Sequence, residues 1–163
     1  MITSRFITFE QAKAVLLHPE IMQRIAEDGA DADDLCAAND DLFIGTFEQT
    51  ERTSQLIGVW WLCPLASTTL DIHAQILQEH RQHKYVSWRQ MLALVQDDLP
   101  SVHKMQARIP VCFPEVYHFA KKVGMLDEGL EKESKVIGGQ FRDQWLVGNT
   151  VEAMAKIAEA RNG

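Results

Sequence analysis

The hydrophobic period changes along this chain, and that change constrains the fold more than any other feature. Segment 70–76 alternates apolar and polar side chains, which predicts a β-strand with one buried face. Its apolar set is Leu70, Ile72, Ala74 and Ile76. A helix over 85–99, a strand over 103–112 and a helix over 114–125 should follow, between earlier antiparallel strands and a closing hairpin. This order predicts one mixed α/β domain, with a central, mostly antiparallel sheet flanked by helices.

Both ends of the sequence are predicted to be helical. Residues 8–27 have helical spacing, interrupted at His18, so that a second helix can begin at Pro19. The tail carries an apolar stripe made of Val151, Met154, Ile157 and Ala158. We assign residues 1–149 to the domain and 150–163 to a helical extension, which either packs on its own sheet or docks a partner.

Composition limits the possible roles. The 163 residues are 46% hydrophobic, which suits a single domain, and the net charge of -7 argues against general binding to nucleic acids or anionic membranes. Three separated cysteines form no CxxC pair, which favours a reducing compartment. With no signal peptide or membrane span apparent, we expect a cytoplasmic protein. The sequence leaves the oligomeric state open.

The segment from Val123 to Gly148 carries a set of ordered motifs. They are Gly124-Met125 at a helix end, Glu128-Gly129, Lys132, and Gly139 with Asp143 in the hairpin. In this order the segment resembles the C-terminal third of the GNAT acyltransferase superfamily. It is most similar to the branch that acylates protein N-termini and ribosomal proteins, and to small GNAT-like proteins of tailed phages. Local structure alone also explains several motifs, since Gly124 can stop a helix and Asp143 can accept backbone hydrogen bonds.

The resemblance implies acetyl-CoA as co-substrate, bound between parallel strands 70–76 and 103–112. In the family a glycine-rich loop then holds the pyrophosphate at a helix N-terminus. Here Arg81 keeps its place, Lys84 replaces the first glycine and Val86 replaces the second small residue. A β-branched residue avoids positive φ, so we expect an ordinary backbone with side chains binding phosphate. The candidate cofactor residues are Arg81, His83, Lys84, Tyr85 and Val86.

The resemblance also implies a base, an acid and an amine acceptor, either a protein or a small molecule. Asp71 and His73 share one strand face and are both candidates for the base, while Tyr117 is the candidate acid, because Ala120 occupies the usual tyrosine position. Each could instead be an ordinary polar residue of the fold. We expect a modestly acidic acceptor cleft, lined by Asp71, His73 and Gln75.

Two further expectations concern metals and partners. His80 and His83 stand three apart, but no further ligand stands at metal-like spacing, so we expect no metal. The alternative to an enzyme is a catalytically silent GNAT-like phage protein, with a head-assembly, internal virion or other protein-binding role. The absent loop glycines and the additional C-terminal helix motivate that alternative.

Overall fold

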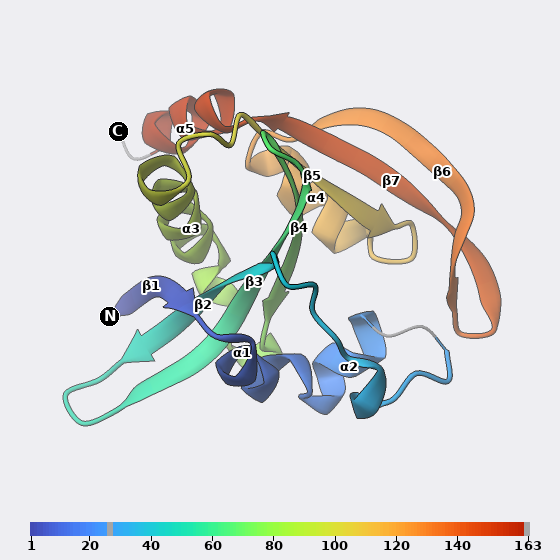
Figure 1. The fold of residues 1–163 in the computed structure, drawn as a ribbon, viewed down its shortest axis with the longest axis horizontal. Coiled ribbons are helices and arrows are strands. Elements are labelled where there is room, and N and C mark those ends of the chain that lie inside the picture. Colours follow the sequence, from blue (N-terminus) through green and yellow to red (C-terminus); the bar gives the residue numbers. More distant parts are fainter. Residues whose placement is uncertain (26–27, 162–163) are drawn as a thin grey trace.

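A computed structural model describes residues 1–25 and 28–161 of the chain (Figure 1). Within these residues, seven strands form one sheet in the order β1-β2-β3-β4-β5-β7-β6. The strands are β1 (Ile2–Ile7), β2 (Leu42–Gln49), β3 (Ser54–Ala66), β4 (Thr69–Ile76), β5 (Lys104–Pro110), β6 (Leu126–Ile137) and β7 (Gln140–Thr150). The helices are α1 (Phe9–Leu16), α2 (Pro19–Ile25), α3 (Lys84–Asp98), α4 (Pro114–Lys122) and α5 (Val151–Ala160), with short 3-10 helices η1 (Ala32–Asp34) and η2 (Gln78–His83). The predicted mixed α/β class with a mostly antiparallel sheet is confirmed.

Strands β4 and β5 form the parallel pair of the sheet. They pair over three residues only, from Thr69↔Lys104 to Asp71↔Gln106, and then diverge. Helix α3 makes the crossover between them, as parallel neighbours require. The unpaired ends of both strands therefore leave backbone edges open in the middle of the sheet.

Neighbouring residues of the central strands pack on opposite faces of the sheet. Ile44 and Trp60 belong to the core beneath α3 and α5, whereas Phe43 and Val59 belong to a second core beneath α1 and α2. This arrangement follows from the alternation of side chains along a strand. Both faces of the sheet are therefore covered.

A buried hydrogen-bonded group fixes α3 on the sheet. The indole Nε1 of Trp60 donates to Ser87 Oγ at 2.7 Å, and that hydroxyl lies 2.6 Å from Thr46 Oγ1. Buried polar groups that are fully paired hold a single arrangement. The first turn of α3 is thereby fixed relative to β2 and β3.

The β6–β7 hairpin curves over toward the α2 region (Figure 1). Asp28 accepts hydrogen bonds from the backbone N–H groups of Gly138 and Gly139 at the hairpin turn. Lys135 Nζ donates to the carbonyl of Ile25 at 3.2 Å. The hairpin thus encloses one side of the space beyond β4 and β5.

The ends of the chain differ in part from the expectations. Strand β1 was not predicted, and it pairs antiparallel with β2. Helix α2 ends at Ile25, and the predicted helical residues 26–27 lie outside the described residues. Helix α5 packs on its own domain, since Val151, Met154 and Ala155 are part of the core with α3. In the described part of the chain, no helix is long and apolar enough to cross a membrane.

Candidate functional site

A cavity of about 450 Å³ opens where β4 and β5 separate. Its walls come from both strands, from Arg81 and Lys84 at the start of α3, from α2 and α4, and from Lys135 of the hairpin. Apolar side chains make up much of the lining, including Trp60, Trp61 and Phe119. A concave, mostly apolar cavity with a few convergent polar groups is typical of a small-molecule site.

The burial of β4 changes along its length. Leu70 and Ile72 are buried as predicted, but Ala74 is exposed and Ile76 is only half-buried. The prediction that all four apolar residues lie under a helix is therefore wrong for the second half of the strand. The reason is the divergence from β5, which leaves both faces of β4 next to the cavity.

Four titratable side chains from three strands meet beside the cavity. Arg108 Nη1 of β5 donates to Asp71 Oδ2 of β4 at 3.0 Å. Arg108 Nε donates to Glu131 of β6, at 3.0 Å from Oε1 and 3.2 Å from Oε2. His73 Nε2 lies 3.7 Å from Asp71 Oδ2. Asp71 and His73 are thus close together, as the alternation predicted, and Arg108 joins Asp71 to Glu131.

The two candidate bases differ in accessibility. The side chain of His73 is 41% exposed and lines the cavity, whereas Asp71 is only 7% exposed and its Oδ1 is buried without a hydrogen bond. Burial lowers the pKa of His73, with the Asp71 carboxylate opposing that shift. Burial raises the pKa of Asp71, against the attraction of His73 and Arg108. His73 therefore faces the cavity with a lowered pKa, and Asp71 lies buried next to it.

The loop before α3 has the ordinary backbone that the absence of glycine predicts. Residues 78–83 form the 3-10 helix η2, and no residue of η2 or of the first turn of α3 has a positive φ. Helix α3 continues directly from η2, and the backbone N–H of Lys84 donates to the carbonyl of Arg81. Arg81 and Lys84 line the cavity at this end, with Lys84 Nζ 5.5 Å from the centre of the Phe119 ring.

The other predicted cofactor residues lie elsewhere. His83 points to β2, where its Nε2 is 3.4 Å from Glu48 Oε1. The ring of Tyr85 is tilted by 55° against that of Phe119, with ring centres 5.2 Å apart, and Tyr85 lines a separate cavity of about 300 Å³. Val86 is half-buried in α3. These three side chains are not among the residues that line the larger cavity.

The structure does not bring Tyr117 to the cavity. Its hydroxyl donates to Asp127 Oδ1 at 2.8 Å, and its ring lies over Trp145 at 4.3 Å. The hydrogen bond to Asp127 raises the pKa of Tyr117. Neighbouring residues of α4 contribute to the cavity instead, namely Val116, Phe119 and Ala120.

Sequence reasoning missed the residues that complete the charged group. Arg108 and Glu131 lie on other strands, and only the register of the sheet brings them to Asp71. A weak signal was present, because Arg108 interrupts the apolar positions Ala107 and Ile109 in a predicted strand. A charged residue in a central strand needs a partner when it is buried.

The expectation of an acidic cleft rested on Asp71, whose carboxylate is paired with Arg108. Five basic side chains and two acidic side chains line the cavity. The basic members are Arg24, Arg81, Lys84, Arg108 and Lys135. Arg24 pairs with Glu115, and Arg108 pairs with both Asp71 and Glu131, so much of this charge is compensated.

Comparison with known proteins shows the class of fold. The chain has the fold of the GNAT acetyltransferases. The spermidine N-acetyltransferase of Vibrio cholerae, solved with CoA and spermine, superposes with a TM-score of 0.75 at 16% identity, covering 94% of this chain and 97% of that chain. A mutant form of the same enzyme superposes with a TM-score of 0.73 at 14% identity, covering 99% of this chain and 98% of that chain. A structure provisionally described as an acetyltransferase superposes with a TM-score of 0.75 at 12% identity, covering 98% of this chain and 90% of that chain. No protein-family profile and no curated protein sequence matches the chain.

Proposed function

We propose that this protein transfers an acyl group from acyl-CoA to an amine. The observation that carries the proposal is the cavity between the diverging ends of β4 and β5, with Arg81 and Lys84 at one end and His73 on its wall. The similarity to acetyltransferase structures supports it at the level of the fold.

The cavity suits the two chemical parts of a CoA ester. The pantetheine arm has amide groups that can pair with the open backbone edge of β4, in the manner of an added strand. The phosphates fit the end where the side chains of Arg81 and Lys84 lie, at the junction of η2 and α3. Side chains here replace the backbone contacts that loop glycines provide in the family.

We assign the role of base to His73. The acceptor must lose a proton before its neutral amine attacks the thioester carbonyl of acyl-CoA. The C–N bond then forms, the C–S bond breaks, and CoA leaves as a thiolate that takes up the proton lost by the new amide nitrogen. His73 faces the cavity with a lowered pKa and can take the proton of the acceptor directly or through one water. Asp71 is a positioning residue, because it is buried and hydrogen-bonded to Arg108.

The acceptor is left as an amine of unspecified class. Because Arg108 is paired with both Asp71 and Glu131, the charges beside His73 do not select between a cationic and an anionic acceptor.

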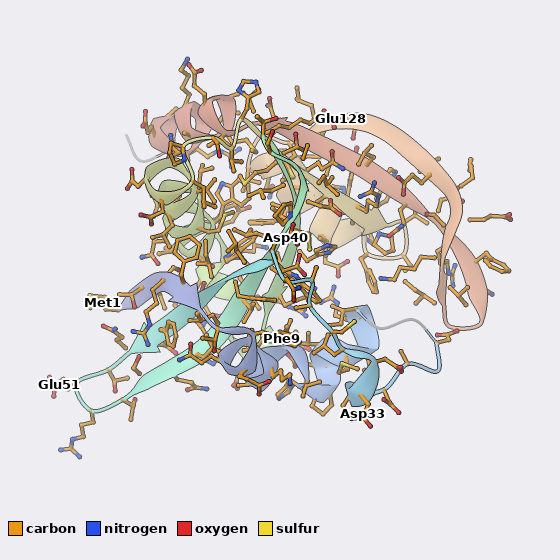
Figure 2. All side chains as sticks on the ribbon, in the orientation of Figure 1. Met1, Phe9, Asp33, Asp40, Glu51 and Glu128 are labelled. Atoms are coloured by element: carbon orange, nitrogen blue, oxygen red, sulfur yellow. The ribbon has the colours of Figure 1, made fainter. Side chains whose placement is uncertain are left out.

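Isothermal titration calorimetry with acetyl-CoA and CoA tests the proposal. We expect binding by the wild-type protein, and weaker binding by roughly tenfold or more for each of Arg81→Ala and Lys84→Ala, since a charge-assisted contact typically contributes about 1.5–3 kcal/mol. Arg52→Ala is the matched control. It removes the same charge at an exposed position that is not among the residues lining the cavity, next to Glu51, which Figure 2 labels at the β2–β3 turn. No binding at millimolar ligand, or equal losses in all three variants, would contradict the proposal.

The alternative of a silent phage protein with a virion or other protein partner remains a second hypothesis. Its motives were the missing glycines and the additional helix. Part of the apolar stripe of that helix packs against the domain itself, because Val151 and Met154 are buried. No contact among the described residues favours this alternative over the enzyme.

A further inference from the structure

Two histidines and a glutamate meet outside the proposed acyl-CoA cavity. Glu48 comes from β2, and His80 and His83 come from η2. Nδ1 of His80 lies 3.2 Å from Glu48 Oε2, and Nε2 of His83 lies 3.4 Å from Glu48 Oε1. One ligand atom from each residue lies within 4.8 Å of the others. The fold therefore supplies the third ligand that the spacing of the sequence did not show.

We propose that Glu48, His80 and His83 form a binding site for a divalent transition metal ion of the zinc class. Zinc bonds of about 2.0–2.2 Å in a tetrahedron place neighbouring ligand atoms about 3.3–3.5 Å apart. Both measured contacts to Glu48 are close to that spacing. Two imidazoles with one carboxylate suit zinc, cobalt or nickel, whereas magnesium and calcium prefer oxygen ligands.

The local helix type explains why the two rings face the same way. Side chains three apart eclipse one another in a 3-10 helix. The rings of His80 and His83 accordingly stack, with centres 6.5 Å apart and planes 27° apart. Arg81 and Lys84 are also three apart, and they line the acyl-CoA cavity instead. The short helix η2 thus separates the metal ligands from the phosphate ligands.

The surroundings of His80 favour a cation. Its side chain is only 12% exposed, and in the described part of the chain neither ring nitrogen makes a well-formed hydrogen bond. Nδ1 faces Glu48, while Nε2 lies 3.3 Å from Glu79 Oε1. Both ring nitrogens of His80 thus face a carboxylate oxygen. A metal ion on Nδ1 would also be bound by Glu48, and Nε2–H can then donate to Glu79 after a small rotation, the usual support for a metal-bound histidine.

The site is open enough to complete its coordination. The side chains of Glu48 and His83 are 34% and 26% exposed, which leaves room for a water as fourth ligand. Gln82, an exposed residue, contacts Nε2 of His83 at 3.3 Å and must turn away when the metal binds. A bound ion would fasten η2 to β2, and so fix the segment that carries Arg81 and Lys84.

Zinc titration of chelator-stripped, full-length protein tests the site. By calorimetry with ZnCl₂ we expect one ion per chain, together with a higher melting temperature and slower hydrogen exchange over residues 78–84. MgCl₂ at equal concentration should change neither quantity. None of these readouts depends on acyl-CoA binding or on activity, so this test and that of the proposed function fail independently.

Variants identify the ligands. We expect Glu79→Gln to weaken zinc binding by about 10- to 100-fold, the usual effect of losing a partner of a ligand, and His80→Ala, His83→Ala and Glu48→Gln to weaken it more. His118→Ala, at an exposed position on α4, is the control and should bind like the wild type. Circular dichroism checks that each variant is folded. Because Glu48→Gln preserves the shape of the side chain, it still tests the site if a histidine variant does not fold. Absence of zinc binding, or unchanged binding in the folded ligand variants, would overturn the proposal.

Discussion

At the residue scale, the base assignment predicts a particular pH dependence. A base works only when unprotonated, so kcat/KM for acyl transfer should fall as the pH drops through its pKa. Burial lowers the pKa of His73 from its usual 6.5, so the acid limb should lie below that value if His73 is the base. An acid limb above 6.5 in the pH profile of the wild type would contradict the assignment to His73.

Substitutions separate the two candidate bases. His73→Ala should lower kcat by roughly 10²-fold or more and remove the acid limb, with acyl-CoA affinity little changed. Asp71→Asn should keep most of kcat and move the limb to lower pH, because the Asp71 charge raises the pKa of His73. Steady-state kinetics from pH 4 to 9 make the measurement, with His118→Ala as control. If Asp71→Asn abolishes turnover while His73→Ala does not, the roles are reversed.

The cysteines give an independent check of local electrostatics. Burial and the nearby Asp41 carboxylate raise the pKa of Cys63 to about 12, whereas Cys36 is exposed at the rim of the cavity. The thiolate is the reactive form, so iodoacetamide at pH 8 should modify Cys36 and spare Cys63. Peptide mapping by mass spectrometry measures the labelling rate of each of these two cysteines. Equal labelling in the folded protein would show that Cys63 is not shielded as described.

At the residue scale, the sequence predicted those features that depend on residues close together in the chain. Alternation along one strand was enough to place Asp71 beside His73. The absence of glycine was enough to predict an ordinary backbone before α3. Arg108, Glu131 and Glu48 could not be found in this way, because each reaches its partner across strands that are distant in sequence.

At the scale of elements, the end of α4 depends on one glycine. Gly124 has a φ of +100°, and a Cβ there would lie 2.5 Å from Ile157 Cδ1 of α5. Gly124→Ala should therefore cost about 1–2 kcal/mol for the backbone and about 1 kcal/mol or more for overpacking. Gly139→Ala is the matched control, since its φ is +70° and nothing lies within 4 Å of the added methyl. Urea denaturation should rank Gly124→Ala as the less stable variant, and equal stabilities would show that the contact with Ile157 relaxes freely.

Local turn chemistry explains which elements could be predicted. Gly124 as a helix stop and Gly138-Gly139 as a hairpin turn both have positive φ in the structure. Asp143 accepts from the backbone N–H of Glu133 at 2.9 Å and from Lys132 Nζ at 2.9 Å, the structural role considered for it. Strand β1 was missed because its residues are mostly half-buried, with polar Thr3, Ser4 and Arg5 in the middle, so it lacks a clear alternation.

At the scale of the whole molecule, strand order could not be obtained from periodicity. Alternation and loop signals predict strands and helices, but many sheet orders satisfy the same pattern. The parallel pairing of β4 with β5 was implied by the GNAT resemblance and is confirmed in the register. The divergence beyond Asp71, which creates the cavity, follows from packing over the whole sheet.

Substitutions in the C-terminal helix α5 test whether this helix is part of the folded domain. Met154 is fully buried in the core shared with α3 and β7, so Met154→Ala should destabilise the protein by about 2–5 kcal/mol. Lys156→Ala is the control on the same helix, because Lys156 is exposed and pairs with Glu152 one turn away, and it should change stability little. The free energy of unfolding in urea measures both variants.

Deletion of residues 151–163 extends this prediction and bears on the docking hypothesis. The truncated chain should unfold cooperatively at a much lower urea concentration, since the core beneath α3 loses Val151, Met154 and Ala155 together. A truncated protein as stable as the full chain would mean that α5 is a separable extension, the arrangement needed for a helix that docks a partner. If the helix belongs to the core, a partner could meet only its exposed side, where Glu152, Lys156 and Glu159 lie. Charge reversal at these three positions then becomes the test of docking, because it changes that surface and leaves the core intact.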